Sequence, residues 1–160
     1  MGNPATPESL IARWHEVLVD PSLKDLPYKI ELNAWGKVEM SPASNRHGRL
    51  QAELAAELKR QLPRGTVITE CSVLTRIGIR VPDVVWASSM QAPDICVEIV
   101  SPSNVQAEIE EKKAAYLRAG AREVWIISEQ GAIRFFGAGG EKPASNLAAP
   151  ITLPEPADKQ

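Results

Sequence analysis

Residues 81–113 read VPDVVWASSMQAPDICVEIVSPSNVQAEIEEKK, and this stretch decides the fold. It contains two apolar runs, 81–86 and 95–100, and each run holds one acidic residue, Asp83 in the first and Glu98 in the second. Runs of about five to seven residues that are rich in Val and Ile, with a short connection between them, predict two β-strands. A carboxylate buried in a strand is strongly unfavourable unless an opposite charge compensates it. We therefore expect a metal ion or a lysine beside these acids.

The alternation of side chains along a strand predicts where the two acids lie. Successive strand residues point to opposite faces of a sheet. Cys96 and Glu98 therefore share one face of the second strand, while Val97 and Ile99 share the other. If the two strands pair as a hairpin, Asp83 lies on the same face as Glu98 and close to it.

A helix is predicted to follow the second strand, at about residues 104–119. Ser103 and Gln106 fit a capping box, and Gly120 stands where helices commonly end. Because the helix returns the chain to the sheet, it is expected to bring its own side chains to the two acidic strands.

One face of this helix carries a lysine among apolar residues. Val105, Ile109, Lys112 and Tyr116 recur at spacings of three and four, which places them on one helical face. Lys113 lies at the edge of that face. The pattern predicts that Asp83, Glu98 and Lys112 converge from two strands and one helix.

These residues resemble the motifs of a known nuclease group. Pro82-Asp83, a glutamate near a strand end and a helical lysine resemble the PD-(D/E)XK nuclease superfamily. More narrowly, the chain resembles the Uma-two family of small bacterial proteins described as restriction endonucleases. The segments that carry this resemblance, within roughly residues 28–136, are VEMSPASNRHGRLQAEL, RVPDVV, PDICVEIVSPS and EEKKAAYLRAGAREVWII.

The chain departs from the superfamily pattern at two positions. Residue 100 is Val, so the second strand lacks the lysine of a Glu-x-Lys motif, and the resemblance implies that Lys112 supplies it from the helix. Glu108 stands where relatives more often carry Asp, which leaves a role for Glu108 open.

The resemblance implies metal-dependent cleavage of DNA. Asp83 and Glu98, with the backbone carbonyl of Ile99, are expected to hold Mg²⁺ or Mn²⁺, because hard cations prefer oxygen ligands. Lys112 is expected to position or deprotonate the attacking water. A structural ion pair, with Asp83 or Glu98 bridged to Lys112, is the alternative reading.

Five further residues are candidates for accessory roles. His47 stands where relatives commonly carry histidine, and it is a candidate phosphate contact or a structural residue. Glu53 and Glu70 are candidate extra acids, or solvated positions on a helix and a strand. Tyr116 is a candidate for orienting the lysine, or a core residue, and Lys113 is the second lysine of the pair.

The whole pattern predicts an α/β (α+β) fold with a restriction-endonuclease-like αβββαβ core, preceded by an added N-terminal helix and a β-hairpin. Thr6-Pro7 starts the first helix, which ends near Asp20-Pro21. The predicted hairpin strands are 28–33 and 37–40, and the predicted core elements are a helix from Ser44 to Pro63, strands 66–72, 77–86 and 94–100, a helix at 104–119 and a strand at 123–127. We expect one domain over 1–160, with a core at about 28–136 and an irregular C-terminal tail over 137–160 that holds at most a weak strand at 149–153.

The composition limits the function classes. The chain has 160 residues, 44% of them hydrophobic, and a formal net charge of −2, so any DNA binding must come from a local basic patch. Candidate members of that patch are Arg46, Arg49, Lys59, Arg60, Arg64, Arg76 and Arg80. Cys71 and Cys96 show no zinc-binding spacing and read as reduced thiols. With no membrane-spanning or signal segment in view, we expect a cytoplasmic protein.

Two functions remain open at this point. The first is a Mg²⁺-dependent endonuclease that hydrolyses DNA phosphodiester bonds. The second is a non-catalytic, dimeric binding module built on a nuclease-like core, which the low net charge favours. A homodimer is expected for the endonuclease, because a chain of this size offers one active site and cleavage of a duplex needs two.

Overall fold

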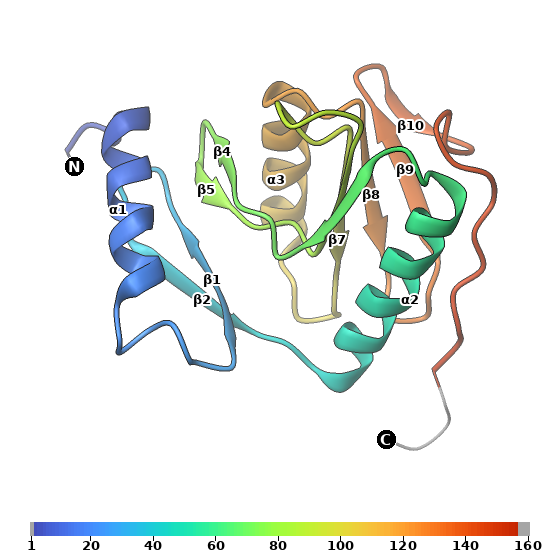
Figure 1. Cartoon of the computed structure of the whole chain (residues 1–160), viewed down its shortest axis with the longest axis horizontal. Helices are drawn as coiled ribbons and strands as arrows, with labels where there is room; N and C mark the ends of the chain where they lie inside the picture. The colour runs from blue at the N-terminus through green and yellow to red at the C-terminus, as the bar shows by residue number, and fades with distance from the viewer. Residues whose placement is uncertain (1, 157–160) are drawn as a thin grey trace.

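A computed structural model describes residues 2–156 of the chain (Figure 1). It is a mixed α+β structure with three helices and two sheets. The first helix and the first two strands lie to one side of the six-stranded sheet. The elements are α1 (Pro7–Val19), β1 (Tyr28–Leu32), β2 (Val38–Pro42), α2 (Asn45–Gln61), β3 (Thr66–Thr69), β4 (Val73–Thr75), β5 (Gly78–Arg80), β6 (Val84–Ala87), β7 (Ile95–Ile99), α3 (Gln106–Arg118), β8 (Glu123–Ile127), β9 (Ile133–Gly137) and β10 (Gly140–Lys142).

The larger sheet contains the predicted nuclease-like core. Its six strands lie in the order β10-β9-β8-β7-β6-β3, with β7 and β8 parallel and the other neighbours antiparallel. The sequence α2, β3, β6, β7, α3, β8 reproduces the αβββαβ order, so the predicted fold class is confirmed. No helix among residues 2–156 has the length and hydrophobicity needed to cross a lipid bilayer.

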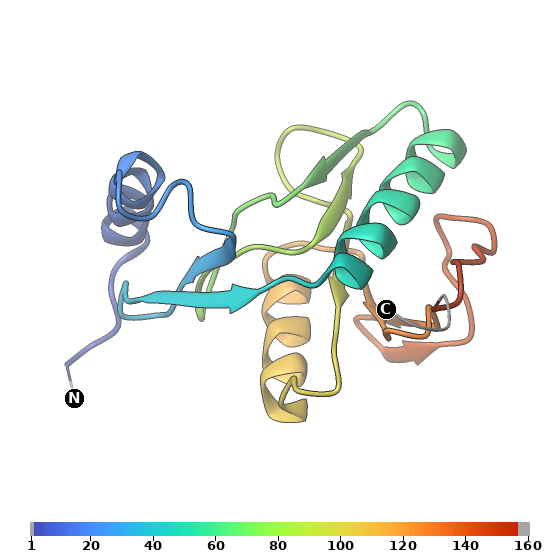
Figure 2. The same cartoon turned by 90° about the horizontal axis from the view of Figure 1, so that it is seen from below.

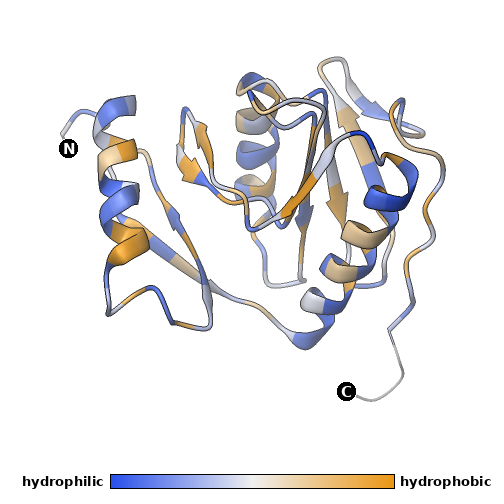
Figure 3. Ribbon diagram, viewed as in Figure 1, coloured by the Kyte–Doolittle hydropathy of each residue, from blue (hydrophilic) through white to orange (hydrophobic). Residues whose placement is uncertain are grey.

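Helices α2 and α3 cover opposite faces of this sheet (Figure 2). Leu54 of α2 packs with Val97 of β7 in one buried cluster, whereas Tyr116 of α3 packs with Cys96 in another. Both faces of β7 are therefore buried, which explains its unbroken apolar sequence. Figure 3 shows hydrophobic residues concentrated in the strands between the two helices.

The smaller sheet forms a separate lobe with α1. Its strand order is β2-β1-β5-β4, and α1 covers one face through a cluster that includes Leu10, Val17, Leu32 and Ile79. The predicted start of α1 is confirmed, since the Thr6 hydroxyl accepts a hydrogen bond from the Ser9 amide at 3.1 Å. The other face of this sheet looks toward the larger sheet.

The predicted strand 77–86 is wrong, because it is two strands in two different sheets. β5 belongs to the smaller sheet and β6 to the larger one, and the chain crosses between them at Val81-Pro82-Asp83. Proline has no amide hydrogen and cannot continue a ladder, so Pro82 marks the break. Asp83 thus stands where the two sheets meet.

The predicted capping box of α3 is also wrong. The helix begins at Gln106 after Val105, which makes no side-chain cap, while Asn104 Oδ1 accepts a hydrogen bond from the Ser101 amide at 2.6 Å. The Asn104 side chain therefore binds within the turn at 101–104 instead of capping the helix. The predicted helix end is confirmed at Gly120, whose φ of +116° is the left-handed conformation that favours glycine.

The C-terminal region over 137–156 packs against the core. β10 pairs with β9, and Leu153 is buried in the cluster under α2, although residues 149–153 form no strand. Arg46 ties this region to α2, since its guanidinium donates to the carbonyls of Glu129 at 2.8 Å and Pro154 at 2.6 Å. The last part of the predicted tail, 157–160, lies outside the described residues.

Candidate active site

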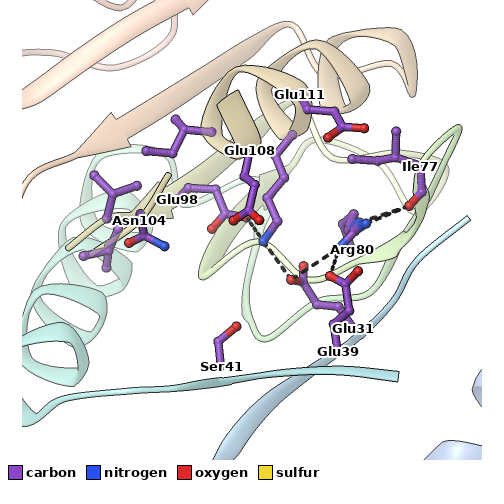
Figure 4. Close-up of a pocket in the computed structure, with 13 residues that line it drawn as sticks. Glu31, Glu39, Ser41, Ile77, Arg80, Glu98, Asn104, Glu108 and Glu111 are labelled. Carbon is purple, nitrogen blue, oxygen red and sulfur yellow. Dashed lines mark hydrogen bonds and ion pairs between the residues drawn. The ribbon is translucent and has the colours of Figure 1, made fainter. Parts of the chain in front are cut away.

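The candidate site is a cleft between the smaller sheet and the acidic end of β6 and β7. A groove of about 840 Å³ and an adjoining pocket of about 170 Å³ share Glu98, Ile99 and Lys112 in their linings. The groove also contains Lys29 and His47, and the pocket contains Glu31 and Arg80 (Figure 4). One continuous recess therefore carries acids and cations from both sheets.

Strand β1 forms one wall of the cleft by simple alternation. Ile30 and Leu32 turn toward α1, so Lys29 and Glu31 face the other way. In the pairing with β2, Lys29 lies opposite Ser41 and Glu31 lies opposite Glu39, which extends the polar wall across both strands.

Asp83 is held at the opposite wall by backbone hydrogen bonds. Its amide donates to the Val97 carbonyl at 2.8 Å, and its Oδ2 accepts a hydrogen bond from the Ile99 amide at 2.7 Å. The antiparallel register that pairs Val84 with Val97 brings Asp83 opposite Glu98. The two acids therefore meet at the end of the hairpin, and the Asp83 side chain is fully buried.

The second oxygen of Asp83 faces two basic side chains. Lys29 Nζ lies 2.7 Å from Asp83 Oδ1, and His47 Nε2 lies 3.0 Å from it. These are ion-pair contacts, and no well-directed hydrogen bond from the described residues reaches this oxygen. Burial disfavours the charged carboxylate, but contact with His47 and Lys29 outweighs burial and lowers the pKa of Asp83. Contact with Asp83 correspondingly raises the pKa of His47.

Glu98 is less well satisfied than Asp83. Its Oε1 accepts a hydrogen bond from the Tyr116 hydroxyl at 2.6 Å and lies 3.7 Å from Lys112 Nζ, while its Oε2 lies 3.5 Å from Lys29 Nζ. Burial raises the pKa of Glu98, and the attraction of Lys29 does not cancel that effect. Glu98 thus has spare capacity for another cation.

Lys112 is oriented by an acid from the smaller sheet. Its Nζ lies 2.7 Å from Glu31 Oε1, and the other oxygen of Glu31 accepts a hydrogen bond from the Val81 amide at 2.7 Å. Arg80 lies 2.8 Å from Glu39 and 3.9 Å from Glu31 (Figure 4). Acids and cations therefore alternate along the cleft from Asp83 to Glu39.

Three of the five accessory candidates reach this cleft. His47 and Tyr116 contact Asp83 and Glu98 directly. Glu70 lines the groove, has a φ of +56°, and accepts a hydrogen bond from Gln51 Nε2 at 2.7 Å. Because Gln51 also donates to the Asp83 carbonyl at 2.7 Å, it links Glu70 to the acidic hairpin.

The other two accessory candidates lie elsewhere. Glu53 is exposed and lines neither recess, because it points outward from α2. Lys113 pairs with Glu110 at 2.5 Å and lies 3.9 Å above the Phe136 ring, on a different side of α3 from Lys112. Both residues lie away from the two recesses, and an accessory role for either one stays a prediction.

Most of the candidate basic residues lie outside the linings of the two recesses. Of the seven candidates, only Arg80 is among the residues that line the two recesses, and it is buried and paired with Glu39. Arg46 binds backbone carbonyls of the C-terminal region instead. The cations that do line the groove are Lys29 and Lys112, with His47 beside them.

Sequence reasoning missed Lys29 and Glu31. Both lie in YKIEL, where charged and apolar residues alternate, and this alternation could have identified a polar face on β1. It could not have shown that the polar face turns toward Asp83 and Glu98, because that depends on how the two sheets pack.

The chemistry of the cleft suits a hard cation. Asp83 and Glu98 offer carboxylate oxygens, Ile99 offers a nearby backbone carbonyl, and Asp83 Oδ1 is a buried oxygen without a directed donor. Within residues 2–156, no cluster of three or more His, Cys, Asp or Glu side chains is arranged to hold a metal. An ion held by these two carboxylates and one carbonyl would have to complete its coordination shell with water.

Known proteins resemble this chain in fold and in sequence. In structure, the chain is similar to a "putative nuclease belonging to DUF820" from Anabaena variabilis, with a TM-score of 0.62, 17% identity, and 94% of each chain covered. It is also matched to a chain of the DrdV-DNA complex, with a TM-score of 0.41 and 12% identity over 84% of this chain and 11% of that one. Among curated proteins, none matches. The family model described as "Putative restriction endonuclease" matches residues 20–153, so the chain belongs to the Uma2 (Uma-two) family.

Proposed function

We propose that this protein is a divalent-cation-dependent endonuclease that hydrolyses phosphodiester bonds in DNA. The observation that carries the proposal is the meeting of two acids at one lysine: the buried Asp83 and Glu98, which lines the groove, both contact Lys29. Lys112 lies 3.7 Å from Glu98. The family description and the nuclease-like fold support it. Buried acids whose charge the protein satisfies only in part are unfavourable for folding and point to a functional use.

In this proposal Asp83 and Glu98 hold Mg²⁺ or Mn²⁺, together with the backbone carbonyl of Ile99. Such an ion supplies neutralising charge and an acidic bound water when it is present. Tyr116 fixes one oxygen of Glu98, and the Ile99 amide fixes one oxygen of Asp83. Each carboxylate is therefore held through one oxygen, and its second oxygen faces Lys29.

Lys112 would act on the water and on the phosphate. Its ammonium is already aimed into the cleft by Glu31, so little side-chain entropy is lost when substrate binds. A fixed positive charge at this point offsets the negative charge that develops on the phosphate oxygens. Glu31 is a positioning residue in this scheme.

The test is a nicking assay on supercoiled plasmid with the full-length chain and Mg²⁺ or Mn²⁺. Asp83→Asn, Glu98→Gln and Lys112→Ala are each expected to abolish nicking. Glu16→Gln is the matched control, because Glu16 is an exposed acid of α1 far from the cleft. Nicking that persists unchanged in Asp83→Asn and Lys112→Ala would rule out this mechanism.

A non-catalytic binding module is the second candidate. One observation favours it: Lys29 contacts both Asp83 and Glu98, so the acids are charge-compensated without any added ion. This function predicts DNA binding that is unaffected by a chelator, together with no nicking by the wild-type chain.

We further propose that the chain forms one domain and works as a homodimer, since cutting both strands of a duplex requires two sites. Light scattering on the purified chain measures its oligomeric state. A monomer that makes only single-strand nicks would contradict the dimer and leave the nuclease proposal intact.

A further inference from the structure

The ammonium of Lys29 lies in the gap between the two candidate metal-binding acids. It is 2.7 Å from Asp83 Oδ1 and 3.5 Å from Glu98 Oε2, and its side chain is 11% exposed. Lys29 comes from β1 in the smaller sheet, whereas both acids belong to the hairpin of the larger sheet. The contact therefore joins the two sheets at the site itself.

The oxygens that Lys29 contacts are the same two that remain for a metal ion. Asp83 Oδ2 is taken by the Ile99 amide, and Glu98 Oε1 is taken by the Tyr116 hydroxyl. Asp83 Oδ1 and Glu98 Oε2 are left, and both face Lys29. An ion about 2.1 Å from these oxygens would lie within repulsive distance of the ammonium in its present position.

We propose that Lys29 is the resident counter-ion of the metal-free site, and that a divalent cation binds only as the Lys29 ammonium withdraws from between Asp83 and Glu98. This inference rests on the proposed function, because it concerns the same two acids. It adds Lys29, a residue of the smaller sheet, to the site. In this scheme the incoming ion displaces the Lys29 ammonium.

The fold gives the displaced ammonium a place to go. Lys29 lines the groove, and its long flexible side chain can turn from the acids toward that space. Among the described residues, the other basic side chains that line the groove are Lys112 and His47. Loading the ion would therefore also present a second ammonium, beside Lys112, to a phosphate backbone.

Lys112 offers a matched control for this displacement. It also carries one positive charge near Glu98, at 3.7 Å, but it is held by Glu31 and does not contact Asp83. Lys29→Met and Lys112→Met are the same substitution at two positions in the cleft, and each removes one positive charge. Only Lys29→Met vacates the gap between the two acids.

The experiment is calorimetric titration of Mn²⁺ into the wild-type chain and the two variants. Lys29→Met is expected to bind Mn²⁺ about tenfold more tightly or better, because the ammonium between the two acids no longer has to leave. His47 stays beside Asp83 in both variants and in the wild type. Lys112→Met is expected to change the affinity by less than about threefold, through charge alone. Binding by Lys29→Met where the wild type shows none would support the proposal even more directly.

The contrary results are distinguishable. An equal gain in both variants, or no gain in Lys29→Met, overturns the displacement and leaves the proposed metal site standing. Absence of Mn²⁺ binding in the wild type and in a folded Lys29→Met alike overturns the proposed function, and the displacement with it.

A second measurement covers the case in which Lys29→Met fails to fold. The wild-type chain, labelled with ¹⁵N at the lysine ζ position, should show a protected Lys29 ammonium signal without metal, because that group is buried against two carboxylates. Saturating Mg²⁺ is expected to remove the protection. A Lys29 signal that stays unchanged at saturation overturns the proposal.

Discussion

Two buried glutamates on neighbouring parallel strands have opposite surroundings. Glu123 on β8 accepts from Trp125 Nε1 at 2.8 Å, Ser145 Oγ at 2.7 Å and the Asn146 amide at 2.7 Å, and it pairs with Lys142 at 2.8 Å. Glu98 on β7 has one hydrogen bond, from Tyr116, and two longer ion contacts.

The pKa shifts of the two glutamates follow this difference. Burial alone would raise both values. For Glu123 the contacts with Lys142 and Trp125 outweigh burial, and its pKa is lowered. For Glu98 burial prevails, and its pKa is raised. Burial therefore does not identify a functional acid; incomplete satisfaction by the protein does.

The largest expected contrast is in activity. Glu98→Gln should reduce plasmid nicking by about 10³-fold or more, because it removes a ligand and a charge from the reacting centre. Glu123→Gln should retain nicking per folded molecule, because its side chain contacts only the C-terminal region and Trp125. Both variants are assayed at a temperature where circular dichroism shows a folded chain. Loss of nicking in both would contradict the assignment of a functional role to Glu98 and a structural role to Glu123.

The reverse contrast is expected in stability. Glu123→Ala should lower the free energy of unfolding by about 3–5 kcal/mol, because it leaves Lys142 and three further donors without their acceptor. Glu98→Gln should leave stability unchanged or raise it by about 1 kcal/mol, because it removes a poorly solvated charge. Urea denaturation in the presence of a chelator measures both, and a larger loss in Glu98→Gln would contradict the comparison.

Acidification should reveal the lowered pKa of Glu123. A carboxyl whose pKa is lower in the folded state contributes stability above its unfolded value of 4.5, and that stability is lost as pH falls through the folded pKa. The free energy of unfolding of the wild type should therefore decline below about pH 4.5 more steeply than that of Glu123→Gln. Parallel pH profiles for the two chains would mean that Glu123 is not held in this way.

The smallest expected effects come from single donors. Ser145→Ala removes one hydrogen bond to Glu123 and should lower stability by about 1 kcal/mol without altering nicking. Tyr116→Phe removes the hydrogen bond to Glu98 and should slow nicking by about tenfold with a similar loss of stability. Equal effects of Ser145→Ala and Tyr116→Phe on nicking would contradict the different roles assigned to Glu123 and Glu98.

Much of the fold follows from local pattern, and so does the pairing of Asp83 with Glu98. The alternation in 95–100 correctly places Cys96 and Val97 on opposite faces, toward α3 and α2. The split at Pro82 was not evident, because residues on both sides of it are apolar and fit a single strand.

The residues that contact the acids and Lys112 could not be predicted from local sequence pattern. Lys29 is 54 residues before Asp83, and Glu31 is 81 residues before Lys112. Such contacts depend on how the smaller sheet packs against the larger one, which periodicity within a strand does not encode. For the same reason Glu123 could not be told from Glu98, since the donors that satisfy it come mostly from 142–146.

The crossing at Val81-Pro82-Asp83 has a practical consequence. Lys29 and Glu31 are carried by the same lobe as α1, and the chain passes from that lobe to the acidic hairpin through this short link. We therefore expect a bulky affinity tag or an immobilising tether at the N-terminus to disturb the ion pairs that Lys29 and Glu31 make in the cleft. Reagents meant to report on this protein are better attached at its C-terminal end.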